Sequence, residues 1–251
     1  MAWDRGEPTG VRAIAALQKS DRGSSNSFLV LADDGARYWC KVLNNGQSPR
    51  VPVNEQVVGR LGKLVGIGVC EAQLVEITED LAGWEFAGGK ALEPGWAHGS
   101  RAVEGAIETN TLDHRADDEN ASRHAGFVAL FDWLGGSDPQ WLYSTTDSNR
   151  YFSHDHGHYL GTPEWTIDTL DQRREGEIAL PGDKAGLSQR ELRRVAEALG
   201  RIGRVDLENA LRGIPAEWPV TDHELEAVVD FADYRRVPVA KRLQALGKGD
   251  G

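Results

Sequence analysis

The chain has 251 residues, of which 40% are apolar, so it can form one large domain or two lobes that share a cleft. Its formal net charge of −11 argues against direct nucleic-acid binding, because such binding depends on cationic side chains that neutralise phosphates. The two cysteines, Cys40 and Cys70, suggest neither a disulfide framework nor a metal-binding spacing. The first residues lack the features of a signal peptide, and no run is long enough to cross a membrane, so we expect a cytoplasmic setting.

The first predicted elements are a polar loop and a β-hairpin. The loop over residues 20–27 is rich in serine, and strands are expected over 28–32 and 36–43, around an Asp-Asp-Gly turn. Alternation along the second strand places Lys41 on the face opposite its two neighbours. A lone lysine at a strand end is usually a solvated charge. Pointing into a cleft, however, it would neutralise nucleotide phosphates.

A helix is predicted next, opening at Val53 and carrying apolar residues at helical spacing as far as Val65. Glu55 lies in its first turn, a position that the helix dipole alone favours for an acid. A carboxylate on this helix is also the expected partner of Lys41.

The middle of the chain contains a predicted buried strand over 69–77 and a connector at 76–78, which could pair with a nucleotide base. The glycine-rich stretch over 83–99 shows no clear periodicity. We interpret it as a candidate lining for the substrate side of the cleft.

Two acidic residues seventeen positions apart, Asp138 and Asp155, mark the most informative part of the sequence. A helix predicted over 117–134 is followed by two glycines, and a proline follows Asp138, so this carboxylate is expected on a loop. Asp before Pro is also a common turn former. A short β-prone run then ends at Asp155, close to Gly157, where a carboxylate is well placed to meet a metal.

These residues resemble the HipA-like kinases, in which an Asn-x-Asp-x-His-x-x-Asn loop supplies a catalytic Asp and a following Asp-His-Gly or Asp-Phe-Gly supplies a Mg²⁺ ligand. The resemblance implies that Asp138 is the catalytic aspartate, that Asp155 binds Mg²⁺ and that Lys41 binds phosphate, with Glu55 as its ion-pair partner. It also implies that the loop is a phosphate loop in which such kinases autophosphorylate a serine. The loop residues predicted to bind the nucleotide are Gly23, Ser24 and Ser25.

The sequence departs from the family pattern around Asp138. Gly136 stands two residues before it, and Tyr143 stands five after it, where the pattern has a metal-binding Asn. Gln140 occupies a slot that often holds His, and its amide oxygen could contact substrate or metal. The local sequence resembles a shorter branch of the family, which makes Tyr143 a branch feature. The alternative is a pseudokinase that binds nucleotide and acts through a partner protein.

Three histidines beside Asp155 offer a competing interpretation. On a continuous strand, His154, His156 and His158 would share one face and could bind zinc, as in a hydrolase. Gly157 makes a continuous strand less favourable. The magnesium interpretation instead packs His156 behind Asp155, with His158 capping the turn or meeting a phosphate.

The rest of the chain is predicted to be mostly helical. The polar stretch over 166–186 is expected to be a mobile loop, and residues 247–251 a flexible tail. Between them lie helical patterns over 188–199, 205–211, 222–231 and 237–246, the first with a capping box.

Together these elements predict an α+β, two-lobed, protein-kinase-like fold. The amino-terminal nucleotide-binding lobe would span residues 1–78 and the mostly helical catalytic lobe residues 79–246. The expected activity is phosphoryl transfer that depends on ATP and Mg²⁺. By resemblance, we expect a serine/threonine kinase with a protein substrate and an antitoxin-like partner, as in the toxin and antitoxin pairs of the family.

Overall fold

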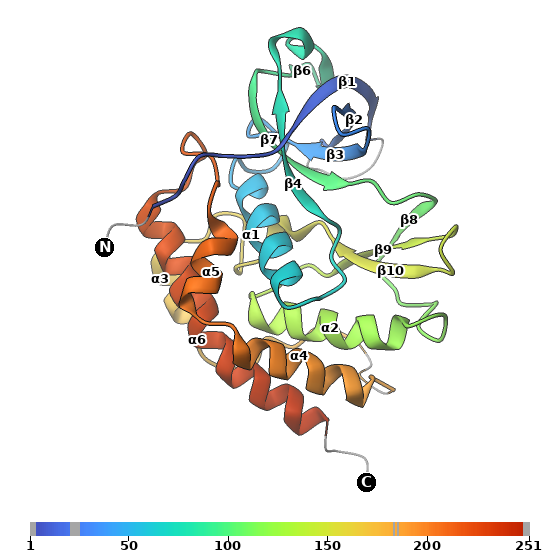
Figure 1. The fold of residues 1–251 in the computed structure, drawn as a ribbon, viewed down its shortest axis with the longest axis vertical. Coiled ribbons are helices and arrows are strands. Elements are labelled where there is room, and N and C mark those ends of the chain that lie inside the picture. The colour runs from blue at the N-terminus through green and yellow to red at the C-terminus, as the bar shows by residue number, and fades with distance from the viewer. Residues whose placement is uncertain (1–3, 21–25, 183, 185, 248–251) are drawn as a thin grey trace.

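Five strands of the amino-terminal part form a closed barrel. The computed structural model describes residues 4–20, 26–182, 184 and 186–247. The antiparallel pairs of the barrel are closed by a parallel pairing between its first and last strands. In barrel order the strands are β1 (Val11–Lys19), β2 (Phe28–Ala32), β3 (Arg37–Lys41), β7 (Gly95–Arg101) and β4 (Ala72–Ile77). Figure 1 shows the barrel above a body of helices.

Alternating apolar residues fill the barrel. Phe28 and Val30 of β2 and Tyr38 and Cys40 of β3 are buried inside it, as the two-residue period of a strand requires. The β2–β3 turn depends on Gly35, whose φ of +78° is a conformation that glycine adopts without strain. The hairpin predicted from the sequence is therefore present.

The glycine-rich stretch is more ordered than its sequence suggested. It contains a hairpin of β5 (Glu85–Ala87) and β6 (Lys90–Ala91) and then the start of β7, and the one-turn η1 (Glu79–Leu81) precedes it. Because β7 pairs with both β3 and β4, the chain leaves the barrel after Arg101. The barrel therefore includes a strand that follows residue 78 in the sequence. These pairings join distant segments, which periodicity cannot detect.

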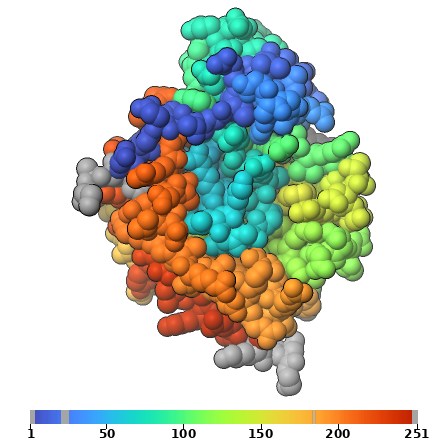
Figure 2. Space-filling model, viewed as in Figure 1, coloured from blue at the N-terminus to red at the C-terminus, as the bar shows by residue number. Residues whose placement is uncertain are grey.

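Helix α1 (Val51–Leu64) lies between the barrel and the helices. It begins two residues earlier than predicted, with Pro52 in its first turn, where the missing N–H is not needed. Val53, Val57 and Leu61 are fully buried in the larger hydrophobic core. Figure 2 shows α1 on one face, between the barrel and the carboxy-terminal helices and below the amino-terminal segment.

A small antiparallel sheet and the helix before it carry the two acidic loops. The sheet is formed by β8 (Ala106–Thr109), β9 (Gln140–Ser144) and β10 (Arg150–His154), in the order β10-β9-β8. Helix α2 (Asn120–Trp133) precedes β9, and the one-turn η2 (His156–His158) follows β10. Gln140 pairs with His154, so the start of β9 and the end of β10 lie side by side.

Four further helices complete the body: α3 (Ile167–Gln172), α4 (Gln189–Arg201), α5 (Arg204–Leu211) and α6 (Asp222–Leu246). The stretch predicted as a loop over 166–186 contains α3, whose first turn is capped by Thr166. The two helices predicted over 222–231 and 237–246 are one helix with Pro238 inside it.

The α+β class is confirmed, with a β-rich amino-terminal part and a helical carboxy-terminal part. Among the helices in the described ranges, none has both the length and the hydropathy needed to span a membrane.

Candidate active site

Lys41, at the end of β3, is the centre of a buried charge cluster. Its Nζ lies 2.6 Å from Oε1 of Glu55 and 2.6 Å from Oδ1 of Asp155. The lysine is 8% exposed and Glu55 is 3% exposed, whereas the Asp155 side chain is 24% exposed. The fold thus brings together three residues from β3, α1 and the end of β10, with Asp155 on the solvent side.

Lys41 and its carboxylate partners stabilise the charged forms of Lys41 and Glu55. Burial disfavours the charged lysine, but Glu55 and Asp155 outweigh it and raise the pKa of Lys41 above its ordinary value. Burial would likewise raise the pKa of Glu55, but Lys41 and two neighbouring histidines lower it well below the usual range. The lysine is therefore cationic and Glu55 anionic at neutral pH.

Asp155 stands on a strained turn. Its φ of +53° lies in the left-handed region, which a non-glycine residue adopts only when its surroundings hold it there. The next peptide is fixed by α1, because the N–H of His156 donates to Oε2 of Glu55 at 2.9 Å. Glu55 therefore binds the lysine with one oxygen and the Asp155 turn with the other.

Asp138 lies on the exposed loop between α2 and β9. Its Oδ2 accepts a hydrogen bond from Nε2 of Gln140 at 2.9 Å, so this glutamine orients the carboxylate. The unusual Gly136 has a local reason, because a Cβ there would overlap the ring of Phe131. The N–H of Leu160 donates to the carbonyl of Leu134 at 2.9 Å, which ties this loop to the segment after Asp155.

Tyr143 does not occupy a metal-ligand position. Its ring packs against His114 and Tyr151, with centroid distances of 4.6 and 5.5 Å. Mg²⁺ is usually held by one or two carboxylates together with substrate phosphates and waters. Asp155 supplies one partly exposed carboxylate, and its Oδ2 has no hydrogen bond from the described residues. The donor set therefore fits a divalent ion that is also held by a nucleotide.

The histidines near Asp155 do not form the zinc site that a continuous strand would create. β10 ends at His154, and His156 and His158 lie in η2, so the three do not share a strand face. No group of three or more metal-ligating side chains occurs among the described residues. His156 is 3% exposed, bonds Oγ of Ser153 at 2.9 Å, and has its pKa lowered to about 4 by burial.

The predicted phosphate-loop residues Gly23, Ser24 and Ser25 lie outside the described residues. Their role in nucleotide binding stays a prediction, as do the roles of Lys41 and Asp155.

Sequence reasoning missed one side chain beside the charge cluster, His98. His98 of β7 and His154 line a cavity of about 10 Å³ together with Glu55 and Asp155. Nε2 of His154 is buried and has no hydrogen-bond partner among the described residues. Burial lowers the pKa of His98 to about 4. No sequence signal marked His98, because its position in β7 follows from non-local strand pairing.

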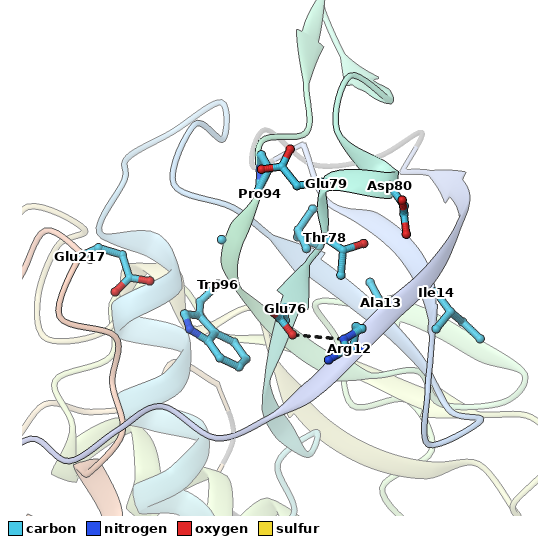
Figure 3. Close-up of a pocket in the computed structure, with 12 residues that line it drawn as sticks. Arg12, Ala13, Ile14, Glu76, Thr78, Glu79, Asp80, Pro94, Trp96 and Glu217 are labelled. Carbon is cyan, nitrogen blue, oxygen red and sulfur yellow. Dashed lines mark hydrogen bonds and ion pairs between the residues drawn. The ribbon is translucent and has the colours of Figure 1, made fainter.

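A larger hollow of about 770 Å³ lies outside the barrel, between β1, β4, β7 and the loop before α6. Figure 3 shows Trp96 at its edge and Arg12 paired with Glu76, whose Oε2 is 3.4 Å from the arginine Nε. The connector at 76–78, predicted to meet a nucleotide base, lines this hollow. None of Lys41, Glu55, Asp138 and Asp155 lines it.

Two solved kinase structures are similar to the chain. A proinflammatory kinase of Helicobacter pylori, CtkA, superposes with a TM-score of 0.60 and 12% identity, over 95% of this chain and 99% of its own. The Golgi casein kinase superposes with a TM-score of 0.50 and 9% identity, over 98% of this chain and 73% of its own. At such identities the likeness shows the fold alone, and this is a kinase fold.

No curated protein sequence matches the chain. The family model described as HipA-like kinase matches residues 13–156, which is more than half of the chain and includes both acidic loops and the Lys41–Glu55 pair. The resemblance inferred from the sequence is confirmed, and the chain belongs to the HipA-like kinase family.

Proposed function

We propose that the chain is an ATP- and Mg²⁺-dependent protein kinase that phosphorylates serine or threonine, with the barrel part and the helical part as its two lobes. The observation that carries this proposal is the position of Lys41, 2.6 Å from both Glu55 and Asp155. A lysine held by a helix carboxylate beside a metal-binding aspartate is the arrangement that phosphoryl transfer in kinases requires. The family match supports the same activity.

The side chains divide the work by their positions. Lys41 binds phosphate oxygens, and Asp155 holds Mg²⁺, which when bound neutralises charge on the phosphates. Asp138, exposed and oriented by Gln140, accepts the proton of the attacking hydroxyl. The bond from that oxygen to the terminal phosphorus forms as the bond to the ADP oxygen breaks. In this proposal the acceptor hydroxyl belongs to a protein substrate, and an antitoxin-like partner regulates the enzyme.

A pseudokinase is the second candidate, because Tyr143 packs into an aromatic cluster where the family pattern has a metal-binding Asn. Such a protein would bind nucleotide without turnover and act through a partner. Turnover by the wild type distinguishes the two functions.

The test compares Asp155→Asn with Asp138→Asn. Thermal shift with ATP, with and without Mg²⁺, measures binding, since a ligand of the native state stabilises it by mass action. Phosphate transfer from labelled ATP measures chemistry. Asp155→Asn should lose the Mg²⁺-dependent shift, whereas Asp138→Asn should keep the shift and lose about 100-fold or more in rate.

Equal loss of binding in both variants would show that the division of roles is wrong. A wild type that binds ATP but transfers no phosphate to any protein or to itself would favour the pseudokinase.

A further inference from the structure

Asn54, one residue before Glu55 on α1, is fully buried beside the Asp155 turn. Its Nδ2 donates to the carbonyl of Gly157 at 2.8 Å, and its Oδ1 accepts from Nε1 of Trp165 at 2.7 Å. An indole N–H can only donate, so the Trp165 bond fixes which end of the amide faces Gly157. The tryptophan therefore orients Asn54 for its contact with the turn.

Two adjacent residues of α1 thus hold two peptides of the turn, which are separated by one peptide. Glu55 accepts from the N–H of His156, and Asn54 donates to the carbonyl of Gly157. The turn also lies directly on the helix, because a Cβ at Gly157 would come within 2.9 Å of Val51. These contacts surround the left-handed conformation of Asp155 and oppose its relaxation.

Trp165 is itself held in place by Arg50. It is 0% exposed, and the guanidinium of Arg50 lies 4.6 Å from its ring centroid. The same arginine donates to the carbonyls of Trp165 and Pro219 and pairs with Glu224 of α6. The start of α1, the segment after the Asp155 turn and the start of α6 are therefore joined through Arg50, which lies over the tryptophan ring.

We propose that Asn54 and Trp165 are positioning residues that hold the carboxylate of Asp155 in its metal-binding orientation. The inference rests on the proposed function, in which Asp155 binds Mg²⁺. Loss of the amide contact leaves the carbonyl of Gly157 buried without its partner and frees the turn to relax. The Asp155 carboxylate then has its metal-binding orientation in a smaller fraction of the molecules, so the apparent affinity for Mg²⁺ falls.

The chain offers a matched control for this test. Trp133 is also 0% exposed, and its Nε1 donates to the carbonyl of Ala232 at 2.8 Å, between α2 and α6. Trp165→Phe and Trp133→Phe each remove one buried indole hydrogen bond and keep an aromatic ring. Both should lower the melting temperature, but only the first touches the Asp155 turn.

The first measurement is a Mg²⁺ titration at fixed, saturating ATP, followed by thermal shift. We expect Trp165→Phe to raise the half-saturating Mg²⁺ concentration about tenfold, as the loss of outer contacts to a metal ligand commonly does. Trp133→Phe should leave that concentration unchanged. Equal Mg²⁺ dependence in the two variants would overturn the proposal.

The second measurement needs no nucleotide or metal. Hydrogen exchange of peptides covering residues 152–166 should be faster in Trp165→Phe than in the wild type, and unchanged in Trp133→Phe. Unchanged exchange in Trp165→Phe would contradict the proposed role of Asn54 and Trp165 in holding the Asp155 turn, even if the wild type bound no nucleotide. The absence of any Mg²⁺-dependent nucleotide shift in the wild type would instead contradict the proposed function.

Asn54→Ser provides a second variant if Trp165→Phe does not fold. A serine hydroxyl is too short to reach both Gly157 and Trp165. The Asn54→Ser variant should show the same rise in the half-saturating Mg²⁺ concentration and the same faster hydrogen exchange. Wild-type values for both would overturn the proposal.

Discussion

At the scale of single residues, Lys41 could be a surface charge on sequence grounds, but in the structure it is buried. The sequence placed it at a strand end, where a lysine that points into a cleft would bind phosphates without packing in the core, so its loss would be expected to spare the fold. In the structure the same amine pairs with two carboxylates, one of them buried on α1. We therefore expect its loss to affect stability as well as the proposed nucleotide binding.

We expect Lys41→Met to abolish ATP turnover and to lower the free energy of unfolding by about 3 to 5 kcal/mol, because it leaves Glu55 buried without its cation. Urea denaturation and phosphate transfer measure the two effects. The double variant Lys41→Met/Glu55→Gln removes the unpaired charge, so it should regain much of the stability and none of the activity. Turnover in a folded Lys41→Met protein would refute the assigned role.

The departures around Asp138 also have explanations at this scale. Gly136 is required by the ring of Phe131, and Tyr143 belongs to an aromatic group with His114 and Tyr151. A comparison of motif letters gives neither reason, because both depend on which side chains the fold places nearby.

At the scale of elements, α6 shows why a proline need not end a helix. Pro238 removes a backbone donor from the middle of α6, which favours a break on sequence grounds. Arg235 and Arg242, on either side of it, both bind the carboxylate of Asp132 on α2, at 2.7 and 2.8 Å. The two halves of α6 are thereby attached to one point of its neighbour.

We expect Asp132→Asn to lower the free energy of unfolding by about 3 kcal/mol, because Arg235 is 0% exposed and would lose its counter-charge. Equilibrium denaturation measures the change. Arg204→Gln, which breaks partly exposed pairs with Glu208 and Asp230, is the control and should cost under about 1 kcal/mol. Similar losses in both variants would contradict the role given to the buried pair.

At the scale of the whole molecule, the buried histidines link stability to pH. Burial lowers the pKa of His98 and of His156 to about 4, against about 6.5 for an exposed histidine. Between these values the unfolded chain binds protons that the native protein does not. Stability should therefore be fully present above about pH 6.5 and fall as the pH falls towards 4.

His98→Asn removes one of these groups. The slope of unfolding free energy against pH between 4 and 6.5 should decrease by up to about 1.4 kcal/mol per pH unit. Denaturation series at half-unit intervals measure the slope, and above pH 7 the variant and wild type should run parallel. An unchanged slope in the acid range would show that His98 is not held neutral by its burial.

The local elements of the site were predictable because their signals are local. Alternation identified β2 and β3, helical spacing identified α1, and glycine with proline placed Asp138 on a loop. The short β-prone run before Asp155 was also visible and corresponds to β10, whereas its pairing with β9 was not predicted. These features were enough for the sequence to determine the α+β class and the resemblance to HipA-like kinases.

Contacts between distant segments were decided only by the tertiary structure. Residues far apart in the chain meet where β1 and β4 close the barrel and where β7 lies between β3 and β4. They also meet in the hydrogen bonds from Asn54 to Gly157 and from Trp165 to Asn54. Periodicity reports which face of an element is buried, but not against what. A hydrogen bond between two fixed groups depends on which segments pack together, so local patterns determined β2, β3 and α1, and the packing determined the site.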